Sequence, residues 1–78
     1  DVSNVKDMTG MFYCCNKFNQ DISSWNVSNV KKTRNMFFGC KSFNKDISNW
    51  NVSNVINMDY MFFDCPIYFL LLILFSIL

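Results

Sequence analysis

Residues 27–40, VSNVKKTRNMFFGC, hold the pattern that decides the fold of this chain. The same sequence pattern, VSNV followed by Met-Phe and a cysteine, begins 25 residues earlier at Val2 and 25 residues later at Val52. When residues 2–26 are laid over residues 27–51, 15 of the 25 positions are identical. A fixed period of roughly 20 to 50 residues is typical of stacked copies of one small unit, so the sequence predicts a repeat fold.

The columns that recur between the copies are mostly apolar, which predicts that each unit buries one face against its neighbours. These columns are Val2/Val27/Val52, Val5/Val30/Val55, Met11/Met36/Met61, Phe12/Phe37/Phe62, Tyr13/Phe38/Phe63, Cys15/Cys40/Cys65, Phe18/Phe43, Ile22/Ile47 and Trp25/Trp50.

Within one unit the apolar spacing changes along the chain. From Val30 to Cys40 the apolar residues follow the spacing of one stripe of an α-helix, with Ser28 or Asn29 placed to cap its start and Gly39 near its end. Before this stretch, Trp25-Asn26-Val27 alternates apolar and polar residues, as a half-buried strand does. We therefore expect an α/β solenoid, a stack of about three strand–turn–helix rungs with parallel strand pairing. In each rung, a strand near residues 22–27 leads through a turn at Ser28-Asn29 to a helix near 30–39, and the chain returns through 41–46.

The repeat ends after Cys65, which divides the chain into a repeat region, residues 1–65, and an apolar tail, residues 66–78. The tail reads PIYFLLLILFSIL and carries no charge. Three interpretations stay open. In the first, the tail is the start of a membrane anchor, with membrane contact through Ile67–Leu78. In the second, it is out-of-frame sequence that follows a lesion in a repeat gene. In the third, it is a last strand and helix that cover the final rung.

The repeats resemble a known family. CNKFNQDISSWNVSNV (15–30) and CKSFNKDISNWNVSNV (40–55) are similar to the repeats of BspA-like leucine-rich-repeat surface proteins, and more closely to the mycoplasma-type variant of unknown function. The resemblance covers residues 1–65. It implies a leucine-rich-repeat-like solenoid on secreted or surface-anchored proteins, a role in adhesion, and no catalytic residues.

Four sets of side chains are candidates for chemistry. The cysteine column predicts free thiols that pack as small hydrophobes, while Cys14 stands outside it and is a candidate for cross-linking chains. The asparagine columns (Asn4/Asn29/Asn54, Asn19/Asn44, Asn26/Asn51) predict ladders of turn residues. Asp21 and Asp46 are expected to bond the backbone rather than to line a calcium or sugar site. The aromatic residues Tyr13, Phe38 and Phe63 lie at the edge of the buried stripe. Three roles stay open for them: part of the core, a seal over the groove between helices, or a binding patch.

Composition limits the classes of function. The net charge is +1 with mixed signs, and the densest basic stretch, Lys31, Lys32 and Arg34, is expected to be a solvated face rather than a nucleic-acid site. The chain has no histidine, and no nucleophile lies beside a base, so we expect no enzyme, no catalytic residue, no metal and no cofactor. The repeat predicts a structural and interaction scaffold whose partner is a protein or a surface glycan, and the resemblance implies that it lies at the cell surface or is secreted. The alternatives are a membrane-anchored stalk and a degenerate remnant of a repeat gene.

Overall fold

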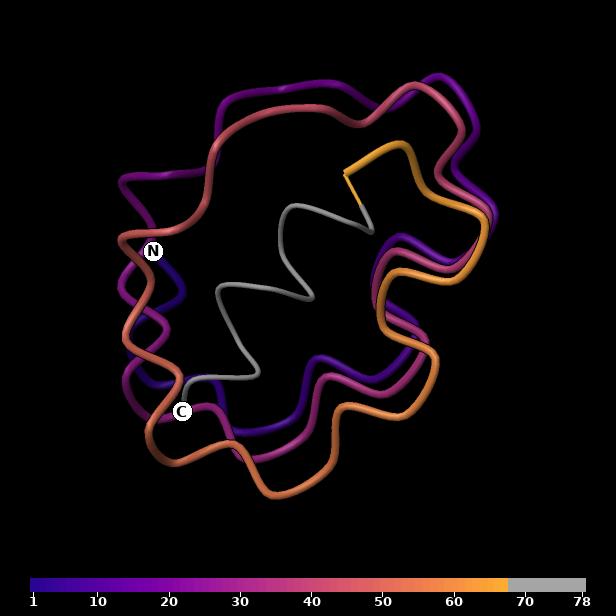
Figure 1. Ribbon diagram of the computed structural model, residues 1–78. Helices are drawn as coiled ribbons and strands as arrows, with labels where there is room; N and C mark the ends of the chain where they lie inside the picture. The colour runs from indigo at the N-terminus through magenta and orange to yellow at the C-terminus, as the bar shows by residue number, and fades with distance from the viewer. Residues whose placement is uncertain (68–78) are drawn as a thin grey trace.

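The computed structural model describes residues 1–67, which wind into three stacked rungs (Figure 1). The first rung is residues 2–26, the second 27–51 and the third 52–67. Viewed along the stack, the indigo, magenta and orange parts of the trace follow one another closely. Backbone hydrogen bonds join neighbouring rungs: the N–H of Met8 donates to the carbonyl of Lys32 at 2.8 Å. The predicted stacking of successive copies is therefore present.

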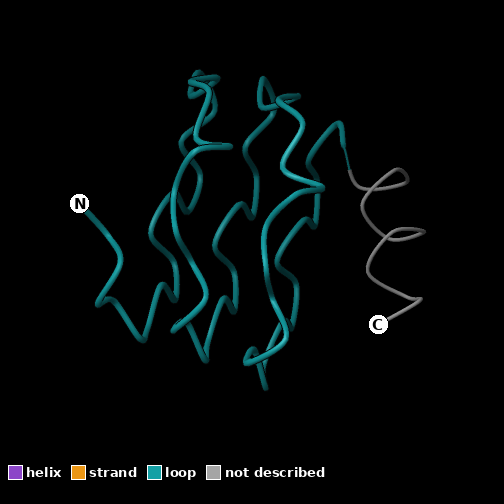
Figure 2. Cartoon of the chain, turned by 90° about the vertical axis from the view of Figure 1, so that its left-hand side faces the viewer, coloured by secondary structure: helices purple, strands orange, loops and turns teal. Residues whose placement is uncertain are grey.

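The part of the chain that the structure describes contains no helix and no extended strand; turns and connecting stretches take their place (Figure 2). Its strand-like pairings are two isolated parallel bridges, Asp7 with Lys32 and Lys32 with Asn57. The prediction of an α/β solenoid is therefore wrong. Neither the strand near residues 22–27 nor the helix near 30–39 forms.

Left-handed backbone explains why the helix does not form. Two columns of residues have positive φ, between 56° and 71°, in every rung. A right-handed helix needs φ near −60°, so a left-handed residue at every fourth position in this stretch interrupts it. These residues are Gly10, Asn35 and Tyr60 in one column and Cys14, Gly39 and Asp64 in the other.

Successive tight turns replace the helix. In the second rung the carbonyl of Thr33 accepts the N–H of Met36 at 3.0 Å, and the carbonyl of Phe37 accepts the N–H of Cys40 at 3.1 Å. The third residue of each turn, Asn35 or Gly39, is the left-handed one, as a type II turn requires. Gly39 therefore belongs to a turn rather than to the end of a helix, and the predicted helix cap at Ser28 or Asn29 is wrong for the same reason.

The prediction that the shared columns form the core is confirmed in the second rung. All its apolar column residues are buried except Phe38, which is partly exposed. Thr33 is buried too, and its hydroxyl donates to the carbonyl of Asn57 at 3.4 Å. The turns thus bring side chains inward at the spacing that predicted a helix. The buried set of this rung is Val27, Val30, Thr33, Met36, Phe37, Cys40, Phe43, Ile47 and Trp50.

Aromatic rings stack through the core in the same register as the backbone. Phe37 lies between Phe12 and Phe62, with ring centroids 5.5 Å apart on both sides. Phe43 stacks on Phe18 at 5.5 Å and on Phe37 at 4.5 Å. Offset stacking at these separations is favourable beyond the burial of apolar area alone, so the ring columns stabilise the packing of rung on rung.

The first rung is less covered than the second. Val5, Phe12 and Phe18 are only partly buried, and Met11 is exposed. Their counterparts in the second rung are buried, and the first rung packs against them.

The tail begins where the described residues end. Ile67 is buried in the core, and Pro66 is exposed. The predictions for residues 68–78 lie outside the described residues, so the three interpretations of the tail and the division between 1–65 and 66–78 stay predictions. Residues 1–67 contain no helix with the length and apolar character needed to cross a membrane.

The left-handed glycines give the first testable prediction. A Cβ at Gly39 would lie 3.3 Å from the Cys14 Sγ atom and 3.5 Å from its Cα atom, whereas at Gly10 the nearest heavy atom is 3.9 Å away. Left-handed backbone costs a residue with a Cβ about 1–2 kcal/mol. We expect Gly10→Ala to lower the free energy of unfolding by about 1 kcal/mol and Gly39→Ala by about 2 kcal/mol or more, because crowding adds to strain. Urea unfolding followed by tryptophan fluorescence measures both, and equal losses would show that the contact with Cys14 is immaterial.

Candidate functional site

The four cysteines divide into an exposed pair, Cys14 and Cys15, and a buried pair, Cys40 and Cys65, and all four thiols are free. The Cys40 thiol donates to the carbonyl of Phe12 in the first rung at 2.9 Å. The prediction of free thiols packed as small hydrophobes is confirmed for Cys40 and Cys65. Cys15 is free, as predicted, but the prediction that it is packed is wrong, because Cys15 is exposed.

Burial decides the protonation of the inner thiols. It raises the pKa of Cys40 to about 11, and the neighbouring sulfur of Cys65 adds to the rise. Burial also raises the pKa of Cys65. Both thiols are therefore neutral at physiological pH and are poor nucleophiles.

A thiol-labelling experiment tests this division. A rise in pKa from 9.0 to about 11 lowers the thiolate fraction near pH 8 by about 100-fold, and burial adds steric protection. We expect iodoacetamide to modify Cys14 and Cys15 at least about 100-fold faster than Cys40, as read by peptide mass spectrometry. In concentrated urea the four rates should converge. Equal rates in the native chain would contradict the buried placement of Cys40.

Asparagine side chains hold turns within rungs, as predicted. The Oδ1 atom of Asn26 accepts the N–H of Ser28 at 3.1 Å and its hydroxyl at 2.7 Å. Asn51 and Ser53 repeat both bonds at the same distances in the next rung. An asparagine that bonds the backbone two residues on mimics a turn, so this column is structural.

A second column of asparagines joins one rung to the next, a role that the sequence analysis did not assign. The Nδ2 group of Asn29 donates to the carbonyl of Ser3 at 2.8 Å, and that of Asn54 donates to the carbonyl of Ser28 at 2.7 Å. Asn4 is their counterpart in the first rung.

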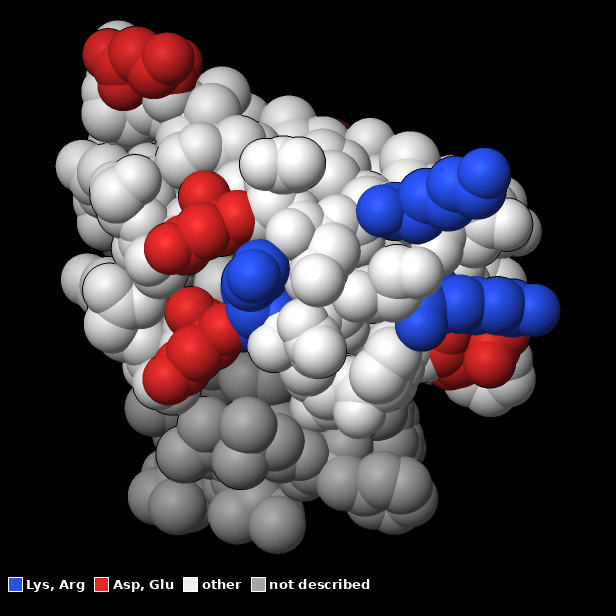
Figure 3. Space-filling model, turned by 90° about the horizontal axis from the view of Figure 1, so that it is seen from above, with Lys and Arg blue, Asp and Glu red and all other residues white. Residues whose placement is uncertain are grey.

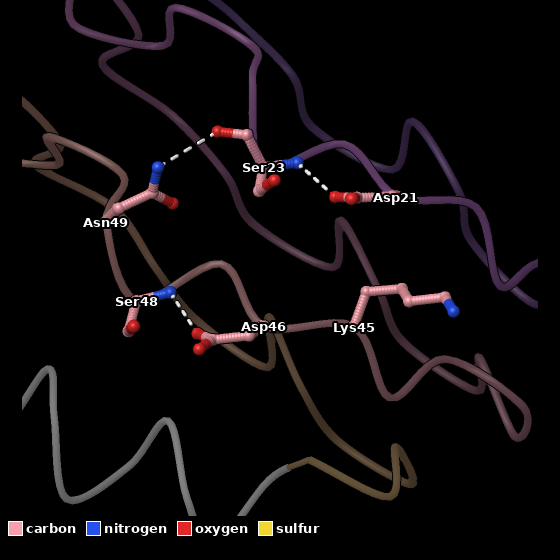
Figure 4. Close-up of a pocket in the computed structure, with 6 residues that line it drawn as sticks. All are labelled: Asp21, Ser23, Lys45, Asp46, Ser48 and Asn49. Carbon is pink, nitrogen blue, oxygen red and sulfur yellow. Dashed lines mark hydrogen bonds between the residues drawn. The ribbon is translucent and has the colours of Figure 1, made fainter.

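The repeated carboxylates line an open hollow together with Ser23, Lys45, Ser48 and Asn49 (Figure 4). The Oδ1 atom of Asp21 accepts the N–H of Ser23 at 2.9 Å, and that of Asp46 accepts the N–H of Ser48 at 2.8 Å. In Figure 4 the two pairs lie on neighbouring rungs, and Asn49 reaches from one to the other. The prediction that these carboxylates bond the backbone is confirmed.

Hydrogen bonds also set the acidity of these carboxyl groups. The side chain and then the backbone N–H of Ser23 hold the pKa of Asp21 below its usual value, and Ser48 does the same for the pKa of Asp46. Thr9 lowers the pKa of Asp7 in the same way, with a smaller contribution from the charge of Lys32.

These depressed pKa values predict acid sensitivity. Stability from such groups is present above the unfolded-state value of 3.8 and is lost as the pH falls through the lower folded-state pKa. We expect a melting temperature that is nearly level from pH 7 to 5 and falls below about pH 4. The triple variant D7N/D21N/D46N keeps the acceptor oxygens, as Asn26 and Asn51 do, and should show a shallower fall. An unchanged fall in this variant would assign the acid sensitivity to other groups.

Charged side chains mix over the face shown in Figure 3, where blue and red groups lie beside one another rather than in one large patch. Lys31, Lys32 and Arg34 are exposed, as expected of a solvated face, although that face is not helical. An exposed pair between rungs, Lys41 and Asp64 at 3.9 Å, contributes little to stability.

The aromatic residues Tyr13, Phe38 and Phe63 form an aromatic ladder across the three rungs. Their ring centroids are 5.0 and 5.1 Å apart and the rings are stacked. Tyr13 and Phe63 are each about half exposed, at 52% and 51%. Tyr60, itself exposed, packs edge-on against Phe63 with centroids 6.0 Å apart. Of the three roles left open for this column, a surface patch agrees with the exposure of both end rings.

Stacking fixes what the aromatic ladder presents to solvent. Each ring turns a face toward the ring of the next rung, so the inner faces are covered and the side of the ladder presents ring edges. Ring edges are apolar and weakly positive. The ladder is therefore a narrow apolar strip along the stack.

No group of three or more cysteine or acidic residues in the described range is arranged to hold a metal ion.

Comparison with known proteins places the chain in a family. No curated protein and no solved structure matches the chain. A family model described as "Mycoplasma protein of unknown function, DUF285" matches residues 1–69. No BspA-like or leucine-rich-repeat family is found, so the assignment to BspA-like proteins is wrong, and only the likeness to a mycoplasma-type domain of unknown function holds. The chain belongs to the family of mycoplasma proteins of unknown function, DUF285.

Proposed function

We propose that this chain is a non-catalytic interaction module of a surface or secreted protein, and that it binds another protein through the aromatic ladder. The observation that carries the proposal is the exposed stack of Tyr13, Phe38 and Phe63, extended by Tyr60. Large aromatic side chains are enriched at protein interfaces, where they supply contact area at low entropic cost.

The orientation of the rings favours a protein partner over a glycan. A sugar packs best on the open face of an aromatic ring, but the inner faces of this ladder are covered by neighbouring rings. Ring edges instead suit aliphatic side chains and backbone carbonyl groups of a polypeptide. The strip also runs across all three rungs, so a partner would engage the stack as a unit.

The groups with chemical reactivity support a structural role. Asp21 and Asp46 hold turns, and the buried thiols of Cys40 and Cys65 have raised pKa values. Each of these groups serves the stack, which agrees with a scaffold rather than an enzyme.

Photo-crosslinking tests the proposed surface. p-Benzoylphenylalanine replaces Phe63, where the half-exposed position leaves room for the added benzoyl group, and the labelled chain is added to intact cells and irradiated. We expect a protein adduct of defined mass that weakens at least tenfold when Tyr13→Ser is also present. The control carries the same probe at Ile56, which is 78% exposed and belongs to another column. Equal adducts from both positions, or none from position 63, would contradict the proposal.

The location of the module has its own test. A module at the cell surface should be cleaved when intact cells of its source are treated with protease, while a cytoplasmic marker stays whole. Protection of both until lysis would contradict a surface location.

A further inference from the structure

Two asparagines of the turn column carry the sequence pattern of an acceptor for N-linked glycosylation. Asn26-Val27-Ser28 and Asn51-Val52-Ser53 both match the pattern Asn-x-Ser, in which the middle residue is not proline. No other asparagine of the chain has a serine or threonine two residues further on. The pattern alone is a hypothesis, and the structure tests it by showing whether the amide is exposed and unoccupied.

The side chain of Asn26 lies on the outside of the stack and is exposed. Its turn has a neighbouring turn on either side along the stack. On one side, the Nδ2 group of Asn29 donates to the carbonyl of Ser3 at 2.8 Å. On the other, the Nδ2 group of Asn54 donates to the carbonyl of Ser28 at 2.7 Å. Asn26 is therefore exposed between two neighbours, so its exposure does not depend on where the stack begins or ends.

The amide nitrogen of Asn26 is unoccupied, whereas its oxygen is held. The Oδ1 atom accepts the N–H of Ser28 at 3.1 Å and its hydroxyl at 2.7 Å, while the Nδ2 group donates to none of the described residues. Asn51 and Ser53 repeat this arrangement. A glycan attached to Nδ2 at either position therefore breaks no hydrogen bond of the described stack.

The serine hydroxyl also favours the chemistry. In this group transfer, Nδ2 attacks C1 of a sugar carried on a lipid diphosphate. The Nδ2–C1 bond forms, the C1–O bond breaks, the lipid diphosphate leaves, and one Nδ2 proton passes to a base of the transferase. Loss of that proton places negative charge on Oδ1, and a hydrogen bond donated to the charged form favours it. The hydroxyl of Ser28 already lies at that oxygen of Asn26.

We propose that Asn26 and Asn51 are sites of N-linked glycosylation, with a lipid-linked diphosphate sugar as the donor and an oligosaccharyltransferase as the enzyme. The glycans cover the outer side of the turn column with bulky polar groups and leave the core unchanged. The proposal goes beyond the function proposed above and is independent of it, because the aromatic ladder belongs to other columns of the repeat.

An in vitro reaction on the full chain tests the proposal. The native chain is incubated with an oligosaccharyltransferase that accepts Asn-x-Ser and with a lipid-linked oligosaccharide. We expect intact mass spectrometry to show chains with one and with two glycans, and peptide mapping to place them at Asn26 and Asn51. Asn26→Gln and Asn51→Gln should each remove one glycan. Ser28→Ala should remove the glycan at Asn26, because it deletes the hydroxyl.

Lys31→Ser is the matched control, because it gives Asn29 the same Asn-Val-Ser pattern in a different setting. Asn29 is exposed too, but its Nδ2 group donates to the carbonyl of Ser3, so the reaction there must first break a contact between rungs. We expect an initial rate at position 29 at least tenfold below that at position 26 of the same chain. In a peptide of residues 20–40 with this substitution, which is too short to stack, the two initial rates should be similar.

Two results would overturn the proposal. One is a native chain without glycan in a reaction that glycosylates a standard acceptor peptide. The other is an equal rate at positions 26 and 29 of the native Lys31→Ser chain, which would show that the unoccupied amide nitrogen has no part in selecting the site.

Discussion

Phe37→Ala is expected to lower the free energy of unfolding by about 3–5 kcal/mol, which is the cost of removing a buried aromatic side chain that cannot be replaced by collapse of its surroundings. Phe37 is fully buried, and its ring contacts a phenylalanine in each neighbouring rung. A chain of 78 residues has a small margin of stability, so a loss of this size removes a large part of it. Urea unfolding followed by tryptophan fluorescence measures the loss.

Phe38→Ala is the matched control. Phe38 is the next residue, lies in the same rung and stacks on an aromatic residue in each neighbouring rung, but it belongs to the partly exposed aromatic ladder. We expect a loss of about 1 kcal/mol, because the exposed position removes less apolar area from water and leaves no closed cavity. A loss equal to that of Phe37→Ala would mean that the two columns share one core and that the ladder is not a surface.

The columns of the stack could be predicted because the same residue types recur at equal positions in the copies. Residues 25 positions apart, such as Phe12 and Phe37, meet in space when copies stack, so identity between copies predicts contact without any knowledge of the backbone between them. The same reasoning predicted the buried thiol of Cys40 and the turn role of Asn26. It could not separate end rungs from inner rungs, so it did not predict the exposure of Cys15.

The backbone between the columns was predicted wrongly because two different backbone conformations produce the same spacing of apolar residues. A helix returns a side chain to one face after three or four residues, and a run of tight turns does the same here. The signal that separates them is the pair Gly10 and Asn35 in one column, since these residue types tolerate left-handed backbone best. Tyr60 in the third copy hid that signal, because a tyrosine rarely adopts this conformation.

Trp50→Ala is expected to lower the free energy of unfolding by about 3–5 kcal/mol, through the lost ring and the carbonyl that it leaves behind. The Trp50 indole N–H donates to the carbonyl of Ile22 at 3.1 Å, and Ile22 is buried. Removing a donor from a buried acceptor costs the desolvation of that group in addition to the packing. Thermal unfolding followed by the fluorescence of the remaining tryptophan measures the change.

Trp25→Ala makes the same chemical change in the first rung, where position alone differs. Trp25 is partly exposed, and its indole N–H donates to none of the described residues. We expect a loss of about 1–2 kcal/mol, because the side chain buries less area and no acceptor is orphaned. The difference between the two variants reports what a neighbouring rung contributes. Equal losses would contradict the partial exposure of Trp25 beside the buried Trp50.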